Sequence, residues 1–166
     1  IQVTSPVLQS INLANLPSLE KINVASDTAL HVLNTSGCPA LKAIMGYASG
    51  IESVDLSKNT KLEQVTLSGT KVKKYDFSNN PELNNIFIGS ESLESVVFKN
   101  NTKVSSLMIS CLKNVKQKPD FTKFPELISL SLDYYPWESF AIPTSKKLNS
   151  LSFQSSEFLK EIDVHE

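Results

Sequence analysis

The chain has 166 residues, of which 40% are apolar and 20% charged, and its formal net charge is −1. This length and composition suffice for one well-buried domain, and no apolar run approaches the roughly 18 residues of a membrane-spanning helix. All 16 basic residues are lysines, so the chain lacks both a basic surface and the forked guanidinium groups with which proteins grip phosphates. We therefore expect neither a nucleic-acid partner nor a membrane span.

Apolar residues recur along the chain in units of the form LxxLxL. Successive units of one series lie 21 to 23 residues apart. The fifteen units contain 45 apolar slots, of which 41 are filled, whereas 40% of 45 is only 18. The exceptions are Thr35, Gly46, Lys118 and Asp120. The first series begins at Leu19, Leu41, Leu62, Leu83, Val104, Leu127 and Leu148, and the second at Leu8, Leu30, Ile51, Val72, Leu93, Val115, Trp137 and Leu159.

Each unit predicts a short strand. Its fourth and sixth residues lie two apart, so they share one face of an extended segment, and the fifth residue points the other way. A coil of about 21 residues with two such strands cannot bury its apolar rows alone, but stacked coils can, with parallel strands about 4.8 Å apart. The intervals between units leave room for little more than turns, so we expect little helix. The N-terminal stretch IQVTSPVLQS is expected to add an edge strand.

The unit LEQVTLSGTKV resembles the LxxLxLxxNxL segment of leucine-rich-repeat proteins, with Thr70 in the Asn slot, and KKYDFSNNPE resembles their variable segment. The alternating halves are similar to a short 21-residue subclass found in bacterial secreted and surface proteins, in the style of internalins. The resemblance implies a mainly β member of the α/β leucine-rich-repeat superfamily. Its form would be a right-handed solenoid of about seven coils, with short strands on both sides, that binds partners.

The asparagines expected in that motif occur in the second series instead. Asn59, Asn80 and Asn101 recur every 21 residues, and Cys38 occupies the same slot one coil earlier. We expect a structural ladder, because stacked amides can satisfy buried backbone groups in the turns. The displaced Asn row leaves open which side of the solenoid is concave. Cys111 belongs to a distant coil, so both cysteines are expected to be free thiols.

No catalytic, metal-binding or cofactor-binding constellation is visible. Two histidines occur, and His31 falls in a row with Glu52, Lys73 and Glu94 that reads as a ladder of alternating charge. No phosphate loop, HExxH motif or nucleophile elbow is present. A glycan-acting enzyme stays as an alternative, because Asp55 and Asp76 would stack, although we expect both to be solvated.

The fifth positions of the first series carry unexpected apolar residues. They read Asn23, Met45, Thr66, Phe87, Met108, Ser131 and Ser152, and all are expected to face solvent. Exposed aromatic and Met side chains among small polar groups are typical of a partner-binding patch. The alternatives are that flanking domains cover this face, or that the chain is a structural spacer. The candidate face, which would engage a protein or a carbohydrate, comprises Met45, Tyr47, Thr66, Asn84, Asn85, Phe87, Met108 and Tyr134.

The coil between Val104 and Leu127 breaks the rule, since Lys118 and Asp120 fall in apolar slots. We expect this side of the coil to bulge as a loop anchored by Phe121 and Phe124, and surface loops on a repeat frame are common recognition sites. Trp137 occupies a Leu slot and is expected to pack in the core, whereas Tyr134 is expected to be exposed.

The repeat covers residues 1–166, which we interpret as a single leucine-rich-repeat domain. The chain starts at Ile1 without a Met or a leader, so we interpret it as a mature product or a fragment of a longer protein with further domains. A secreted or cell-surface location is expected, with the signal and anchor not in this chain.

Overall fold

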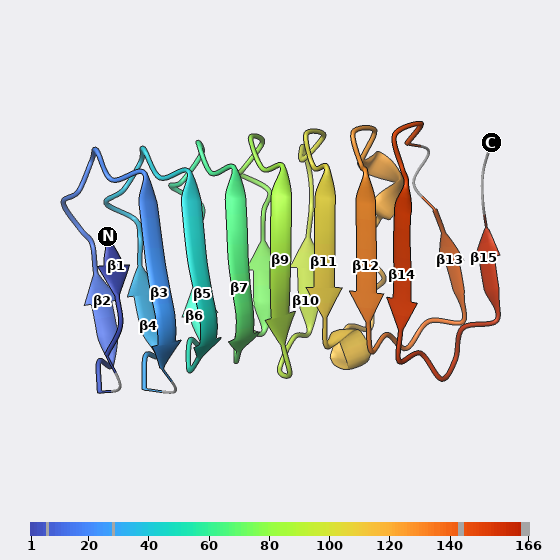
Figure 1. Ribbon diagram of the computed structural model, residues 1–166, viewed down its shortest axis with the longest axis horizontal. Coiled ribbons are helices and arrows are strands. Elements are labelled where there is room, and N and C mark those ends of the chain that lie inside the picture. Colours follow the sequence, from blue (N-terminus) through green and yellow to red (C-terminus); the bar gives the residue numbers. More distant parts are fainter. Residues whose placement is uncertain (6, 28, 143–144, 164–166) are drawn as a thin grey trace.

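The computed structural model describes residues 1–5, 7–27, 29–142 and 145–163. Over these residues the chain forms a mainly β solenoid of about seven coils with almost no helix, as the sequence period predicts. The coils stack along the long axis of the molecule, with β1 and β15 at opposite ends (Figure 1).

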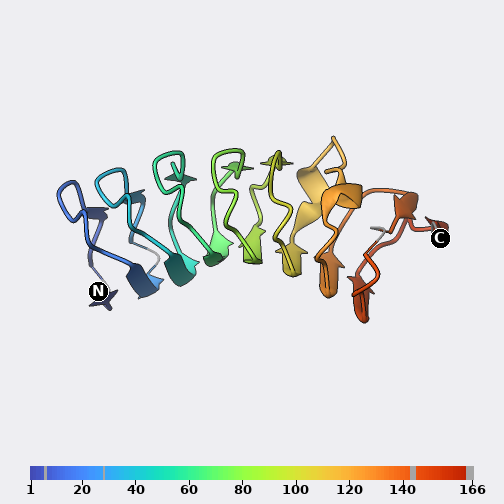
Figure 2. The ribbon, with the colours of Figure 1, turned by 90° about the horizontal axis from the view of Figure 1, so that it is seen from above.

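One side of the solenoid is an eight-stranded parallel sheet. Seven of its strands follow the first series of units, and β1 confirms the edge strand expected at the N-terminus. The stack bends, and this sheet lines the inside of the bend (Figure 2). The first-series side is therefore concave. In sheet order the strands are β1 (Gln2–Val3), β3 (Lys21–Asp27), β5 (Ala43–Ser49), β7 (Gln64–Thr70), β9 (Asn85–Ser90), β11 (Ser106–Ser110), β12 (Ser129–Asp133) and β14 (Ser150–Gln154).

The other side consists of shorter strands that follow the second series. They form three separate parallel sheets in the described residues, ordered β2-β4-β6, β8-β10 and β13-β15. The strands are β2 (Ser10–Asn12), β4 (Val32–Asn34), β6 (Ser53–Val54), β8 (Lys74–Asp76), β10 (Ser95–Val97), β13 (Ser139–Ala141) and β15 (Glu161–Asp163).

The two rows of apolar slots face each other and form one core. Val65 pairs in register with Ile86, and Ile86 with Leu107, and all three are 0–1% exposed. Gly46 interrupts the pattern for a steric reason, because a Cβ there would lie 3.2 Å from Leu67 Cδ2 and 3.3 Å from the carbonyl oxygen of Val24. The inward assignment of the fourth and sixth positions is thus confirmed through the centre of the stack.

The asparagine row is a buried ladder, as expected. Asn59, Asn80 and Asn101 are 0–3% exposed, and each donates two hydrogen bonds from its Nδ2 to backbone carbonyls of the preceding coil, at 2.9 and 3.0 Å. Thr35 fills an apolar slot because its buried hydroxyl donates to Asn59 Oδ1 at 2.8 Å. Cys38 is also buried, and both cysteines are free.

Ion pairs link neighbouring coils on the surface. Lys73 Nζ lies 3.3 Å from Glu94 Oε1, and His31 Nδ1 lies 3.6 Å from Glu52 Oε1, which is an ion pair when His31 is protonated. The expected charge row is confirmed in these two contacts, whereas no ion pair joins Glu52 to Lys73 among the described residues. A matching pair joins Lys42 to Glu20 at 2.8 Å on the first-series side. These groups are largely exposed, so each pair contributes about 0–1 kcal/mol.

The coil after β11 is irregular. Two short 3-10 helices, η1 (Leu112–Asn114) and η2 (Phe121–Lys123), occupy the place where a second-series strand would lie. Phe121 and Phe124 are 3% and 1% exposed, so they anchor this segment in the core as predicted. Asp120 caps η2 by accepting a hydrogen bond from the backbone N–H of Thr122 at 3.1 Å.

Candidate functional site

The candidate face lies on the concave sheet. Strand register places the fifth positions of the first series in one row across the sheet, with Met45 paired to Thr66, Thr66 to Phe87 and Phe87 to Met108. Ser131 and Ser152 continue the row toward the C-terminal end, and Asn23 continues it the other way. Six of the eight predicted site residues are therefore on adjacent strands of one surface, namely Met45, Tyr47, Thr66, Asn85, Phe87 and Met108.

The exposure of this row is uneven, and one expectation was wrong. Met108 is 38% exposed, and Met45 and Phe87 are half-buried. Thr66 is only 5% exposed, although it is on the outward face of β7. The larger side chains of Met45 and Phe87 flank it on the neighbouring strands, so a small residue between them is covered without being part of the interior.

The remaining predicted residues frame this row. Tyr47 is two residues along β5 from Met45 on the same face, and it is 49% exposed. Asn84 and Asn85 are exposed where the chain enters β9. These residues add one aromatic ring and two amides to the concave surface near Met45 and Phe87.

Tyr134 is placed elsewhere. It follows β12 in the turn beyond the sheet, with a left-handed φ of 51°, and it is 50% exposed. It lines a hollow with Lys113, Pro136 and Phe158. Its expected exposure is confirmed, but its ring lies outside the row of Met45, Phe87 and Met108.

Polar groups that the sequence analysis did not select also line the concave sheet. Asp133 faces outward at the end of β12, paired with Gln154, and its Oδ1 is buried with no hydrogen-bond partner among the described residues. The Oδ1 atom of Asn23, toward the N-terminal end of the sheet, is likewise buried without a hydrogen-bond partner among the described residues. The strand alternation that selected Met108 would have found Asp133, because outward positions recur every second residue.

Asp55 and Asp76, on the second-series side, accept hydrogen bonds that stabilise turns. Asp55 Oδ1 accepts a hydrogen bond from the Ser57 N–H at 2.9 Å, and Asp76 Oδ1 accepts one from the Ser78 N–H at 3.1 Å. These bonds lower the pKa of both carboxyl groups below the ordinary value of 3.8. A general acid needs a raised pKa, so this pair does not have the chemistry of a glycosidase.

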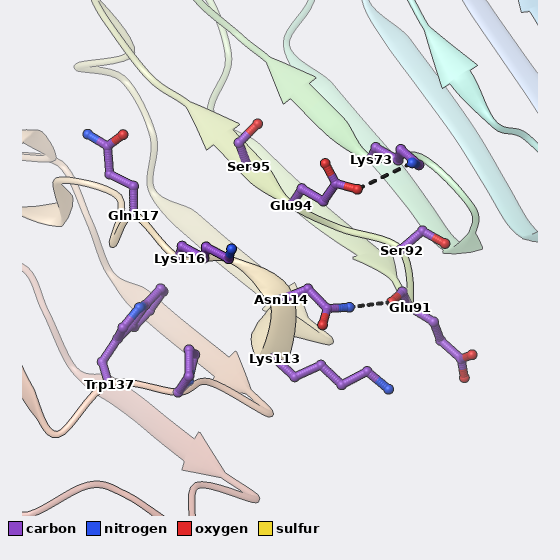
Figure 3. Close-up of a pocket in the computed structure, with 11 residues that line it drawn as sticks. Lys73, Glu91, Ser92, Glu94, Ser95, Lys113, Asn114, Lys116, Gln117 and Trp137 are labelled. Carbon is purple, nitrogen blue, oxygen red and sulfur yellow. Dashed lines mark hydrogen bonds and ion pairs between the residues drawn. The ribbon is translucent and has the colours of Figure 1, made fainter.

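The irregular coil is bordered by hollows. One hollow, of about 1070 Å³, lies beside Trp137 (Figure 3). It is lined by residues at or just before the starts of β8 and β10, by the turn after β9, by η1 and by the segment that follows η1. Trp137 packs against the core as expected, but it is only half-buried, and part of its side chain lines this hollow. Smaller hollows border Pro119, Asp120 and Phe121.

Among the described residues, no group of three or more His, Cys, Asp or Glu side chains is arranged to hold a metal ion. Within the same residues no helix has the length and apolar character needed to cross a membrane. Burial raises the pKa of both cysteine thiols.

No protein-family model matches the chain, and no curated protein matches it. Among solved structures, the chain is similar to one described as the functional domain of InlJ from Listeria monocytogenes, which includes a cysteine ladder. The match has a TM-score of 0.48 and 13% sequence identity, and covers 90% of this chain. The chain spans 42% of the length of that neighbour.

Proposed function

We propose that the chain is a non-enzymatic binding module of a bacterial secreted or cell-surface protein, and that it engages a protein or a carbohydrate through its concave sheet. The observation that carries this proposal is the row of partly exposed Met45, Phe87 and Met108 inside the bend. Apolar side chains grouped on a soluble surface commonly mark a contact site. The 21-residue units, which resemble those of bacterial surface proteins, support the location.

The frame suits such a role. Parallel strands on both sides and a buried Asn ladder hold the row rigidly, so its side chains lose little freedom on binding. A few well-packed anchors then dominate the affinity, and Phe87 and Tyr47 are the aromatic anchors on this sheet. The lowered pKa of Asp55 and Asp76 makes these two carboxyl groups unsuited to act as a general acid.

The test begins with a glycan array and with capture of proteins by the immobilised chain. For any ligand so found, Phe87→Ala should weaken binding at least tenfold, because loss of an anchor costs about 2 kcal/mol or more. Asp76→Ala, on the opposite side, should leave the affinity unchanged. Equal affinity of the parent and Phe87→Ala would place the site elsewhere, and a chain that binds nothing in either screen would be a spacer.

A further inference from the structure

The hollow beside Trp137 exists because the repeat is interrupted there. The unit that begins at Val115 should supply a strand between β10 and β13, but its slots hold Lys118 and Asp120, and β10 and β13 belong to separate sheets. Lys118 donates instead to the carbonyl oxygen of Ser139 at 3.1 Å. The missing strand leaves a hollow of about 1070 Å³ on the flank of the solenoid (Figure 3).

Trp137 forms an aromatic wall of this hollow. The Tyr135 ring stacks against the indole, with centroids 6.0 Å apart and an interplanar angle of 29°, and Tyr135 is 2% exposed. One face of the indole is thus covered by the core, while other parts of it line the hollow. A flat, partly exposed indole is suited to stack on the C–H face of a pyranose ring.

The rest of the lining is polar and carries uncompensated positive charge. Lys113 and Lys116 are exposed, and no carboxylate of the described residues lies within ion-pair distance of either. Lys73 is already paired with Glu94 at 3.3 Å. The carboxylate of Glu91 points away from Trp137 and Lys116 (Figure 3). Lys113 and Lys116 therefore both line the hollow with unpaired ammonium groups, although that of Lys113 extends away from Trp137 (Figure 3).

A second hollow of about 180 Å³ continues this surface. Both hollows are lined by Lys113 and Pro136, so they adjoin. Tyr134 and Phe158 line the second hollow and are 50% and 52% exposed. Tyr134 has a φ of 51°, a conformation that favours Gly or Asn. Its ring is not needed in the core, so the strained position is consistent with a binding role for this side chain.

We propose that these two hollows form a binding site for an acidic saccharide chain, a site separate from the concave sheet. Trp137 and Tyr134 would stack on successive sugar rings, and Lys113 and Lys116 would pair with carboxylate groups. The hydroxyl and amide groups of Ser92, Ser95 and Gln117, which line the larger hollow, suit a ligand rich in hydroxyls better than an apolar peptide.

Trp137 is the single tryptophan of the chain, so its fluorescence reports on this site alone. The probe is tetragalacturonate, an oligomer of four uronic acids, with neutral maltotetraose as control. We expect a saturable fluorescence change with tetragalacturonate and at least tenfold weaker binding of maltotetraose. The Lys113→Ala, Lys116→Ala double variant should bind tetragalacturonate at least tenfold more weakly, and added salt should weaken binding by the parent.

Two further variants separate binding from folding. Tyr134→Asn places a residue that tolerates positive φ in the same turn, so its melting temperature should equal or exceed that of the parent while its affinity falls at least threefold. Phe87→Ala, on the concave sheet, should bind tetragalacturonate as the parent does.

Three results would overturn the proposal. These are no saturable response to tetragalacturonate, equal binding of the neutral tetrasaccharide with no effect of the lysine substitutions, and a response to a proline-rich peptide in place of the saccharides. A negative result would not bear on the proposed function of the concave sheet, because Met45, Phe87 and Met108 line neither hollow.

Discussion

Adjacent residues of this chain can have opposite environments, and Asn79 and Asn80 show it most clearly. Asn80 is 0% exposed and donates hydrogen bonds to the carbonyl oxygens of Asn59 and Leu56, whereas Asn79 is exposed to solvent. The 21-residue period alone separates the two, because only Asn80 is in register with Asn59 and Asn101. The side chain of Asn80 therefore holds two coils together, and that of Asn79 does not.

Asn80→Ala should lower the free energy of unfolding by about 1–3 kcal/mol, because it removes two buried hydrogen bonds, although the carbonyl oxygens of Leu56 and Asn59 each keep one backbone N–H donor. Asn79→Ala is the matched control and should change it by less than about 0.5 kcal/mol. Urea titration of the two variants and the parent measures both values. Equal losses would show that the ladder contributes no specific stability.

Thr66 shows how an outward residue becomes buried. The alternation of β7 places its side chain on the concave face, as expected, but the exposure of that face depends on the size of the cross-strand neighbours. Met45 and Phe87 are both larger and lie on either side. The direction of a side chain is a local property of the strand, whereas its exposure is a property of three strands.

Turns on the second-series side share one device. The residue at or just after the strand end accepts a hydrogen bond from the backbone N–H two residues later, as Asn34, Asp55 and Asp76 do. Asp120 does the same at the start of η2. Each bond closes a tight turn that leads the chain back toward the next coil. Three of these acceptors, Asp55, Asp76 and Asp120, are carboxylates, so the free energy of unfolding should depend on pH.

The carboxyl groups of Asp55, Asp76 and Asp120 have lowered pKa values, the largest causes being hydrogen bonds from Ser57, Ser78 and Thr122. A lowered folded-state pKa contributes stability that is present above the unfolded value and is lost as the pH falls through the folded value. We expect unfolding to become easier as the pH falls below 3.8, the ordinary pKa of an Asp carboxyl group.

The variant Asp55→Asn, Asp76→Asn keeps acceptor oxygens in both turns but removes their titration. Its urea midpoint should therefore fall less than that of the parent between pH 5 and pH 3. Parallel loss in the two proteins would assign the acid sensitivity to other groups.

The solenoid as an assembled stack is nearly one-dimensional, since each coil contacts chiefly its neighbours. Residues in the central strands have a coil on both sides, and Ile86 in β9 is 0% exposed. The equivalent inward residue of β14, Leu151, is 42% exposed, and Ile162 in β15 is 41% exposed. The free energy of unfolding of such an array is approximately the sum of the contributions of its coils and of the interfaces between them. Local stability should therefore decline toward the C-terminal end, where β14 and β15 lie.

Amide hydrogen exchange should follow that gradient. Protection is expected to be highest in β7 and β9 and at least tenfold lower in β14 and β15, because local opening of the terminal coil exposes less apolar surface. A uniform exchange rate along the eight-stranded sheet would mean that the stack opens only as one unit.

Much of this fold could be predicted because a repeat states the same local rule many times. The spacing of Leu62, Val65 and Leu67 recurs in every coil, so one correct assignment of inward positions extends to all of them. The Asn ladder followed from the same period, and the bulge after Cys111 followed from two slots that break it. These are local or periodic properties, and alternation and spacing are enough to determine them.

The curvature, the hollows and the degree of exposure depended instead on contacts between coils. Which side is concave is set by the relative widths of the two sides over several coils, and no single unit contains that information. The hollow beside Trp137 forms where a neighbouring strand is missing, so a Leu-slot residue became half-buried. Tyr134 does not lie on the candidate face, because it is in the turn where the chain leaves the sheet. Thr66 is flanked by Met45 and Phe87, which are 21 positions away in the sequence on either side. Exposure depends on what lies on adjacent coils, and that is decided only when the coils have stacked.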